Sequence, residues 1–323
     1  MRKSADLCGR ESPELFQMAL TRTIEHWKLR SRTLELGRRT LVMGVVNITP
    51  DSFSDGGNFL DTGAAVRRGL ELIEQGADLL DLGAESTKPG SKVGDGNARA
   101  VSADVEQERL LPVIEGILDA RPETVISVDT YKASTAKFAV ELGAEIVNDV
   151  SGFAWDTEMP AVCAEAGCGV VLMHTRGRPD EWSKQLKLSA YDLINLVREG
   201  LAGSWQRATS AGVVAESIVL DPGYGFGKKF EENYVLLAQQ EELLKLGRPL
   251  LAGVSRKSFL GHTLSELFGG KQAPVEERAI ASIAALVAAI LHGTSIVRTH
   301  DVRPAVEASR IADAVLCAVG TDN

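Results

Sequence analysis

Cysteine is scarce in this chain of 323 residues, and a long apolar run is missing. The longest uncharged stretch, residues 279–297, is interrupted by a His-Gly-Thr-Ser sequence, so we expect a buried helix and then a strand rather than a membrane span. The N-terminus carries charges throughout and lacks the apolar core of a secretion signal. The four cysteines have no metal-type spacing and indicate a reduced, cytoplasmic protein. They are Cys8, Cys163, Cys168 and Cys317.

An excess of positive charge is missing as well. Lysine and arginine number 35 against 44 acidic residues, which gives a formal net charge of −9. The chain therefore has no bulk affinity for nucleic acid or anionic lipid, and an anionic ligand would need a local basic pocket. The charged fraction of 24% and the hydrophobic fraction of 44% are ordinary for a globular protein, so the length allows one large α/β domain or two small ones.

What the chain does contain is a series of eight short runs rich in Val, Ile or Leu, as fully buried parallel strands are. These runs are Leu41–Asn47, Ala77–Ala84, Thr124–Thr130, Glu145–Val150, Gly169–His174, Ile218–Gly223, Pro249–Ser255 and Ser295–His300. Most are separated by a helix candidate such as Ala133–Leu142, Leu188–Thr209, Phe230–Leu246 or Glu276–Leu291. Eight strand–helix units in roughly 280 residues favour a (β/α)8 TIM barrel over an open doubly wound sheet.

Polar residues also fall at or near the carboxyl end of every expected strand, and in a TIM barrel these ends converge on one rim. These residues are Asn47, Asp81, Asp129, Asn148, His174, Asp221, Ser255 and His300. We expect residues 27–316 to form the barrel domain and residues 1–26 an N-terminal extension. Residues 27–36 alternate in polarity and precede Gly37, which predicts a hairpin with the first barrel strand that closes the barrel floor.

Four segments suggest chemistry at that rim. Asn47–Gly57 combines oxygen ligands and turn formers, as a cation or phosphate loop does. Leu220–Lys228 lacks the Gly-x4-Gly-Lys-Ser/Thr pattern of a P-loop, so its glycines indicate a tight strand exit close to a planar ligand. In Gly253–Phe259, adjacent Arg and Lys begin a helix, where an anionic ligand would offset their repulsion from the helix dipole. Arg298 and His300 are two apart on a strand and project to the same side, as a pyrophosphate site requires.

In this order, these segments resemble the motifs of the dihydropteroate synthase family, and the resemblance extends over residues 27–312. It includes residues 77–90, whose loop covers the aromatic-amine pocket in that family, although Lys88 stands where the family usually has Arg. The resemblance implies condensation of 6-hydroxymethyl-7,8-dihydropterin diphosphate with p-aminobenzoate, giving 7,8-dihydropteroate and diphosphate. It further implies Mg2+ as cofactor, inhibition by sulfonamides, and a homodimer.

The resemblance implies roles for particular residues. Asn47 would bind Mg2+, Asp221 would read the amino group and ring N–H of the pterin, and Ser258 would receive the p-aminobenzoate carboxylate. Diphosphate would depart first, in an SN1-like step, and the arylamine would then attack a methylene cation shielded by Asp55 and Asp129. The catalytic residues would be Asp55, Asp129, Lys257, Arg298 and His300. The substrate-binding residues would be Phe53, Asp81, Thr87, Lys88, Pro89, Asp129, Asn148, Asp221, Lys257, Ser258, Arg298 and His300.

Two other functions stay open. A pterin-binding methyltransferase acting on methyltetrahydrofolate would share the strand-end Asp and Asn residues, but it has no use for the cation-loop, Ser-Arg-Lys-Ser or Arg298/His300 features. A catalytically dead barrel used as a scaffold would be marked by loss of the motif residues, which are present. No positioned nucleophile is expected, because neither a Ser-His-Asp order nor a Cys-His pair stands at the strand ends. For His174 we expect a core or rim position, since Thr175-Arg176 replaces the Met-Gln that often follows it in the family.

Overall fold

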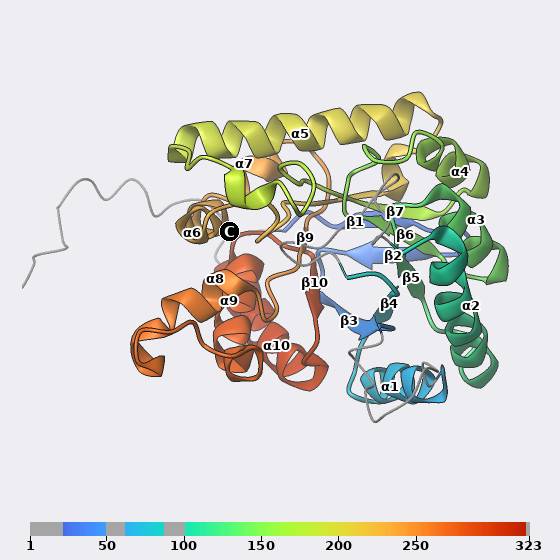
Figure 1. The fold of residues 1–323 in the computed structure, drawn as a ribbon, viewed down its shortest axis with the longest axis horizontal. Helices are drawn as coiled ribbons and strands as arrows, with labels where there is room; N and C mark the ends of the chain where they lie inside the picture. The colour runs from blue at the N-terminus through green and yellow to red at the C-terminus, as the bar shows by residue number, and fades with distance from the viewer. Residues whose placement is uncertain (1–21, 50–61, 87–100, 321–323) are drawn as a thin grey trace, which may run out of the picture.

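The computed structural model describes residues 22–49, 62–86 and 101–320, with side chains up to residue 318, and forms a barrel of parallel strands inside a ring of helices (Figure 1). The barrel strands are β3 (Leu41–Asn47), β4 (Leu79–Gly83), β5 (Ile126–Asp129), β6 (Ile146–Asp149), β7 (Gly169–Met173), β8 (Ile218–Asp221), β9 (Leu251–Ala252) and β10 (Ile296–Thr299). Nearly all of their residues are buried, because helices cover the outside of the barrel while side chains fill its interior.

The strand order confirms the predicted (β/α)8 barrel. Neighbours run β8-β7-β6-β5-β4-β3-β10-β9, and every pair in this sheet is parallel. The circle closes between β8 and β9, where Leu220 forms a parallel bridge with Leu250 and its N–H donates to the carbonyl of Pro249 at 3.0 Å. All strand carboxyl ends therefore meet at one end of the barrel.

The helices follow the strands in the expected alternation and surround them on all sides (Figure 1). They are α1 (Thr62–Glu74), α2 (Ala103–Ala120), α3 (Ala133–Leu142), α4 (Met159–Ala166), α5 (Ala190–Ser210), α6 (Phe230–Ala238), α7 (Glu241–Leu244), α8 (Ser258–Thr263), α9 (Ala279–Leu291) and α10 (Val302–Gly320), with short 3-10 turns at Trp182–Lys184, Ala215–Ser217, Ser265–Phe268 and Val275–Arg278.

The single helix predicted over residues 230–246 is wrong, because the chain breaks between α6 and α7 at Gln240. This side chain is fully buried, and its Nε2 lies 2.8 Å from the hydroxyl of Thr294 and 3.1 Å from the carbonyl of Ala289. Its Oε1 accepts from the Tyr224 hydroxyl at 2.6 Å. Turning the glutamine inward satisfies these buried polar groups, which a continuous exposed helix would leave unpaired.

A hairpin closes the barrel floor, but its pairing differs from the prediction. β1 (Glu25–Lys28) pairs antiparallel with β2 (Thr33–Leu36), not with the first barrel strand. Trp27 is 1% exposed, and its indole N–H donates to the carbonyl of Ser217 at 2.9 Å. Together with Leu29 and Leu36 it packs on the lower layer of barrel side chains, so the hairpin acts as an apolar plug at the end opposite the strand carboxyl ends. The predicted domain boundary at residue 26 is untested and stays a prediction.

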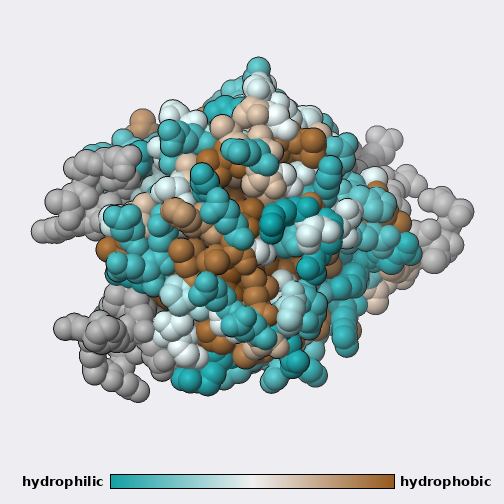
Figure 2. All heavy atoms as spheres, turned by 90° about the vertical axis from the view of Figure 1, so that its right-hand side faces the viewer, coloured by the Kyte–Doolittle hydropathy of each residue, from teal (hydrophilic) through white to brown (hydrophobic). Residues whose placement is uncertain are grey.

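The outer face that carries α2, α3 and α4 gathers hydrophobic side chains near its middle, with hydrophilic ones around them (Figure 2). Val105 on α2 and Phe138 on α3 are among the exposed large hydrophobic residues of these helices. Nowhere in the described part of the chain is a helix both long and apolar enough to cross a membrane.

Candidate active site

The carboxyl ends of the barrel strands carry the polar side chains that the sequence predicted there. Asn47 ends β3, Asp129 ends β5 and Asp221 ends β8, while Asn148 stands one residue before the end of β6. Asp81 lies in the middle of β4, one layer deeper. Because all eight strands are parallel, these side chains belong to one end of the barrel, where TIM barrels build their active sites.

Arg298, on β10, is the centre of the deepest polar cluster. Its Nε donates to Asp81 at 2.6 Å, and its Nη2 donates to Asp129 at 2.7 Å. Asp81 also accepts from the Asn148 amide at 3.1 Å and from the Ser127 hydroxyl at 2.6 Å, so its charge is shared among three donors. Burial opposes the charged state of Arg298, but the two carboxylates outweigh it and raise the pKa of the guanidinium. Burial raises the pKa of Asp129 to about 7, although Arg298 lowers it in opposition.

Asp221 is buried, and among the residues that the structure describes only one of its two carboxylate oxygens accepts a hydrogen bond. Its Oδ1 accepts from the backbone N–H of Gly223 at 2.7 Å, and Oδ2 faces the backbone of Gly253, where an added Cβ would lie 3.8 Å away. Burial raises the pKa of this carboxyl, while the Gly223 hydrogen bond and nearby Lys257 and Arg298 lower it in opposition. The side chain therefore presents an acceptor in a largely dry environment, which suits recognition of paired N–H donors.

Lys257 and Phe226 are in contact at the same end of the barrel. The Lys257 Nζ lies 3.9 Å from the centre of the Phe226 ring, a cation–π contact. Gly225, at φ +80°, lets the lysine stem pass close to the loop, since an added Cβ would lie 3.3 Å from its Cδ. Burial and the Arg298 guanidinium lower the pKa of Lys257 to about 8, and the Asp221 and Asp129 carboxylates oppose this shift.

His300 is held by Ser255 but does not form an activated nucleophile with it. The Ser255 Oγ lies 3.0 Å from the His300 Nδ1, and it accepts from the His300 backbone N–H at 3.2 Å. Burial and neighbouring Arg298 lower the pKa of His300 to about 3, so the ring is a neutral, weak base. When the hydroxyl donates its one proton to Nδ1, the ring keeps Nε2–H as a donor for a ligand.

The remaining predicted residues lie less deeply. Ser258 begins α8 and is half-buried, and Lys257 precedes it as the N-cap residue. The Arg256 guanidinium turns to Asp301 instead of the ring of polar residues at the strand ends. Its two hydrogen bonds to the Asp301 carboxylate measure 3.0 and 2.6 Å. Five predicted site residues lie outside the residues that the structure describes, and their roles stay predictions. They are Phe53, Asp55, Thr87, Lys88 and Pro89.

Asn47 is the residue predicted to bind Mg2+. Its side chain is exposed at the end of β3, and no cluster of three or more His, Cys, Asp or Glu able to hold a metal occurs in the described ranges. Magnesium commonly keeps several waters and takes one or two protein ligands together with substrate phosphates. A single exposed amide oxygen fits a Mg2+ ion that arrives with a diphosphate and does not fit a cage made of protein ligands alone.

Sequence reasoning missed three residues of this end of the barrel. Phe226 contacts Lys257, the Ser127 hydroxyl donates to Asp81, and Lys228 is buried. Lys228 closes the Gly-rich segment 222–228, and its position after three glycines is the only sequence signal that sets it apart. A lysine in such a loop is usually solvated, so its burial becomes visible only in three dimensions.

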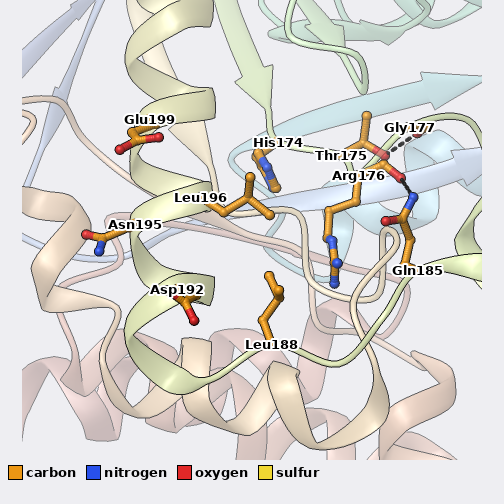
Figure 3. A pocket seen from close by; sticks show the side chains of 10 residues that line it. All are labelled: His174, Thr175, Arg176, Gly177, Gln185, Leu188, Asp192, Asn195, Leu196 and Glu199. Carbon is orange, nitrogen blue, oxygen red and sulfur yellow. Dashed lines mark hydrogen bonds between the residues drawn. The ribbon is translucent and has the colours of Figure 1, made fainter.

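A pocket of about 720 Å3 lies beside this site, between the loop after β7 and α5 (Figure 3). His174 is 7% exposed and lines this pocket together with Leu188 and Leu196, and Asp192 and Glu199 of α5 supply carboxylates. As predicted, His174 occupies a core position. Its pKa is lowered well below the usual range, first by burial and then by Lys228 and Arg176.

Known proteins match this chain over most of its length. The family model described as pterin binding enzyme matches residues 43–300. A dihydropteroate synthase from Synechocystis is 40% identical over 280 residues, covering 86% of this chain and 91% of that protein.

Solved structures agree with this match. A Xanthomonas albilineans dihydropteroate synthase with 4-aminobenzoic acid is 38% identical and superposes with a TM-score of 0.79, covering 91% of this chain and 98% of that one. A Yersinia pestis dihydropteroate synthase with a sulfonamide drug is 36% identical, with a TM-score of 0.80 and coverage of 91% and 99%. Both matches extend over nearly the whole of this chain and of the solved protein.

Proposed function

The chain belongs to the dihydropteroate synthase family of pterin-binding enzymes, and we propose that its barrel mouth joins 6-hydroxymethyl-7,8-dihydropterin diphosphate to p-aminobenzoate. The products are 7,8-dihydropteroate and diphosphate, so the enzyme is a transferase. The observation that carries the proposal is that the buried Asp221 carboxylate lies close to the Arg298 and Lys257 cations at the mouth of the barrel.

We assign the pterin to the acceptor-lined side of this opening. The free Oδ2 of Asp221 accepts from the pterin amino group and ring N–H. The Asn148 side-chain nitrogen donates to Asp81, so the side-chain carbonyl oxygen of Asn148 can accept a hydrogen bond from the ligand. Lys257 donates to acceptor atoms of the ring from beside Phe226. A planar ring with an alternating edge of donors and acceptors satisfies these groups, which would be costly to leave unpaired in a buried site.

The reaction needs charge stabilisation more than a nucleophile. The bond between the pterin methylene carbon and the diphosphate oxygen breaks, the electron pair leaves with diphosphate, and the p-aminobenzoate nitrogen forms the new bond and then loses a proton. Asp129 stabilises the positive methylene carbon, because its carboxylate carries negative charge above its pKa of about 7. Asp55 would add a second carboxylate.

We propose that the departing diphosphate is received by Arg298 and His300. The Nη1 of Arg298 makes no hydrogen bond to the residues described here, and the neutral His300 keeps its Nε2–H as a donor. Asn47 would contribute one ligand to Mg2+, which, when bound, supplies positive charge to the leaving group. Phe53 and residues 87–89 would complete the aromatic-amine side.

The p-aminobenzoate carboxylate would be received by the Ser258 hydroxyl at the start of α8. Relatives solved with 4-aminobenzoic acid and with a sulfonamide drug support these ligands for this chain, and we propose sulfonamides as inhibitors. We further propose a cytoplasmic homodimer. α9 is apolar on both faces, yet Ile280 on its outer face is 87% exposed, and the neighbouring α10 exposes Ile311 at 69%.

One assay separates this function from its alternatives. We expect diphosphate to be released stoichiometrically with dihydropteroate from the pterin diphosphate, with more product in Mg2+ than in EDTA, and a sulfonamide to inhibit. Methyl transfer from methyltetrahydrofolate without diphosphate release would favour the methyltransferase. Pterin binding without turnover of either substrate would favour a scaffold.

A further inference from the structure

The loop between β8 and α6, residues 222–229, contains a buried lysine, Lys228, which holds the loop in place. We propose that Lys228 is a positioning residue for the pterin pocket, because its side-chain nitrogen ties this loop to the carboxyl end of β7. The inference rests on the proposed function, since it concerns how that pocket keeps its shape.

Four acceptors surround the Lys228 Nζ. The carbonyl of Gly223 lies at 2.8 Å, the carbonyl of His174 at 3.2 Å and the carbonyl of Phe226 at 3.4 Å. The fourth contact is the His174 Nδ1 at 3.0 Å. An ammonium group has only donors, so the imidazole accepts through Nδ1 and carries its proton on Nε2. This arrangement fixes both the loop and the tautomer of the histidine.

The same loop shapes two walls of the pterin pocket. The N–H of Gly223 orients Asp221, while the carbonyl of the same residue is the shortest contact of Lys228. Gly223 has φ +70°, and an added Cβ would lie 1.9 Å from the His174 carbonyl oxygen, so the loop is pressed against β7. Three residues further on, Phe226 places its ring under Lys257 and edge-on to Trp182, with ring centres 5.1 Å apart.

The charges around Lys228 suit a role in function better than one in stability. Burial lowers the pKa of its ammonium to about 7, while Asp221 and Glu232 favour the charge and Arg176 and Lys257 oppose it. An apolar side chain of similar volume would fill the space without the cost of burying a charge. Such a side chain, however, has no N–H groups to donate to the three carbonyls and the imidazole.

The far side of His174 offers a way to disturb the link without touching Lys228. His174 lines the outer pocket (Figure 3), and its ring lies against Gly200 of α5. A Cβ at Gly200 would lie 2.4 Å from the His174 Cδ2, so a methyl group there must displace the ring. Gly203 is on the same helix, and a Cβ there would meet only the Arg207 side chain at 3.6 Å, an ordinary contact.

The test measures binding of a pterin without diphosphate by calorimetry. We expect Lys228→Met to weaken binding at least tenfold and Lys229→Met, whose exposed amine donates to the Ser183 carbonyl, to stay within twofold of wild type. We expect Gly200→Ala to weaken binding at least threefold and Gly203→Ala to leave it unchanged. In 15N spectra of the wild type, His174 should show a protonated Nε2 and a free Nδ1, and this preference should disappear in Lys228→Met.

The outcomes separate this inference from the function on which it rests. If the wild type fails to bind any pterin, the proposed function is wrong, and the positioning role falls with it. If the wild type binds and the Lys228→Met and Gly200→Ala variants bind equally well, only the positioning role is overturned. If Lys228→Met does not fold, Gly200→Ala and the His174 tautomer decide the matter by themselves.

Discussion

Oppositely charged side chains at the mouth of this barrel are already paired with one another before a substrate binds. Arg298 holds Asp81 and Asp129, and Lys257 stands near Asp221, in surroundings where water is scarce. Burying charges costs free energy that pairing only partly returns, so such a cluster is expected where function needs it. Donors and acceptors that are already oriented can stabilise developing charge without reorganising during the reaction.

The substitution Asp221→Asn tests whether the Asp221 carboxylate recognises the pterin ring. One carboxylate oxygen is held by Gly223, so the amide would turn its NH2 group toward the donors of the ligand. An unpaired donor clash in a buried site should cost about 3 kcal/mol of pterin binding, or roughly a hundredfold in Kd. Asp313→Asn, the same chemical change at a pair with Arg22 near the hairpin end, is the control. Calorimetric pterin affinity within threefold of wild type for Asp221→Asn would contradict the assignment.

The pH dependence of kcat/KM for the pterin diphosphate should have two limbs. Activity should rise with pH until Asp129 is ionised, near its pKa of about 7, because the neutral acid cannot stabilise a positive methylene carbon. It should fall above about 8 as Lys257 loses its proton. These values belong to the free enzyme, which kcat/KM reports. Lys257→Arg stays charged and should remove the alkaline limb, whereas a flat profile from about pH 6 to 9 would show that neither group matters.

Whether a residue of the site could be predicted from the sequence depends on how that residue is positioned. Asp129, Asn148 and Asp221 sit at the ends of apolar runs, and strand periodicity alone brings such residues to one rim. Their bonding could not be predicted, because the partners of Arg298 lie 217 and 169 positions away. Lys228 was missed for a related reason: three of its four acceptors are backbone carbonyls, which leave no mark on the sequence, and the fourth, His174, is 54 residues away.

At the scale of elements, long apolar runs and whole helices were predictable and their interruptions were not. α3 occupies the predicted residues 133–142, because its periodicity is local. The break before α7 depends on Gln240 finding Thr294 and Ala289, 54 and 49 residues away. The hairpin was expected from alternation, but alternation does not specify the partner strand, and β1 pairs with β2.

The floor hairpin supplies stability and should not affect the chemistry. Trp27→Ala would empty a fully buried site and remove the hydrogen bond to Ser217, at a cost of about 3–5 kcal/mol of unfolding free energy. Trp27→Phe keeps most of the apolar volume and loses the donor, so about 1 kcal/mol is expected. Denaturant unfolding measures both, and kcat/KM should stay within about twofold because the plug lies at the other end of the barrel. A large loss of kcat/KM in folded Trp27→Phe would show that the two ends are coupled.

At the scale of the whole molecule, closure of the barrel and the nature of its surface are set by different residues. Closure depends on a single bridge between Leu220 and Leu250, since β9 has only two residues. The surface departs from an ordinary pattern at α9, where Ala285, Leu286 and Ile290 are buried against the barrel while Ile280 faces outward. A helix that is apolar on every face is normally buried on every face, so we expect another protein surface to cover the outer face of α9.

A second copy of the chain should supply that cover. Ile280 and Ile311 lie on the adjacent helices α9 and α10, so each Ile→Glu substitution would place a charge in the contact. In sedimentation velocity the wild type should run at twice the monomer mass of 34.6 kDa, and Ile280→Glu together with Ile311→Glu should return it to the monomer. Tyr191→Glu is the matched control, because this side chain is 77% exposed on α5, and α6 and α7 stand between α5 and α9 in the order of helices around the barrel. A wild type that stays monomeric at micromolar concentration, or a double variant that stays dimeric, would show that the apolar face of α9 and α10 is not the contact.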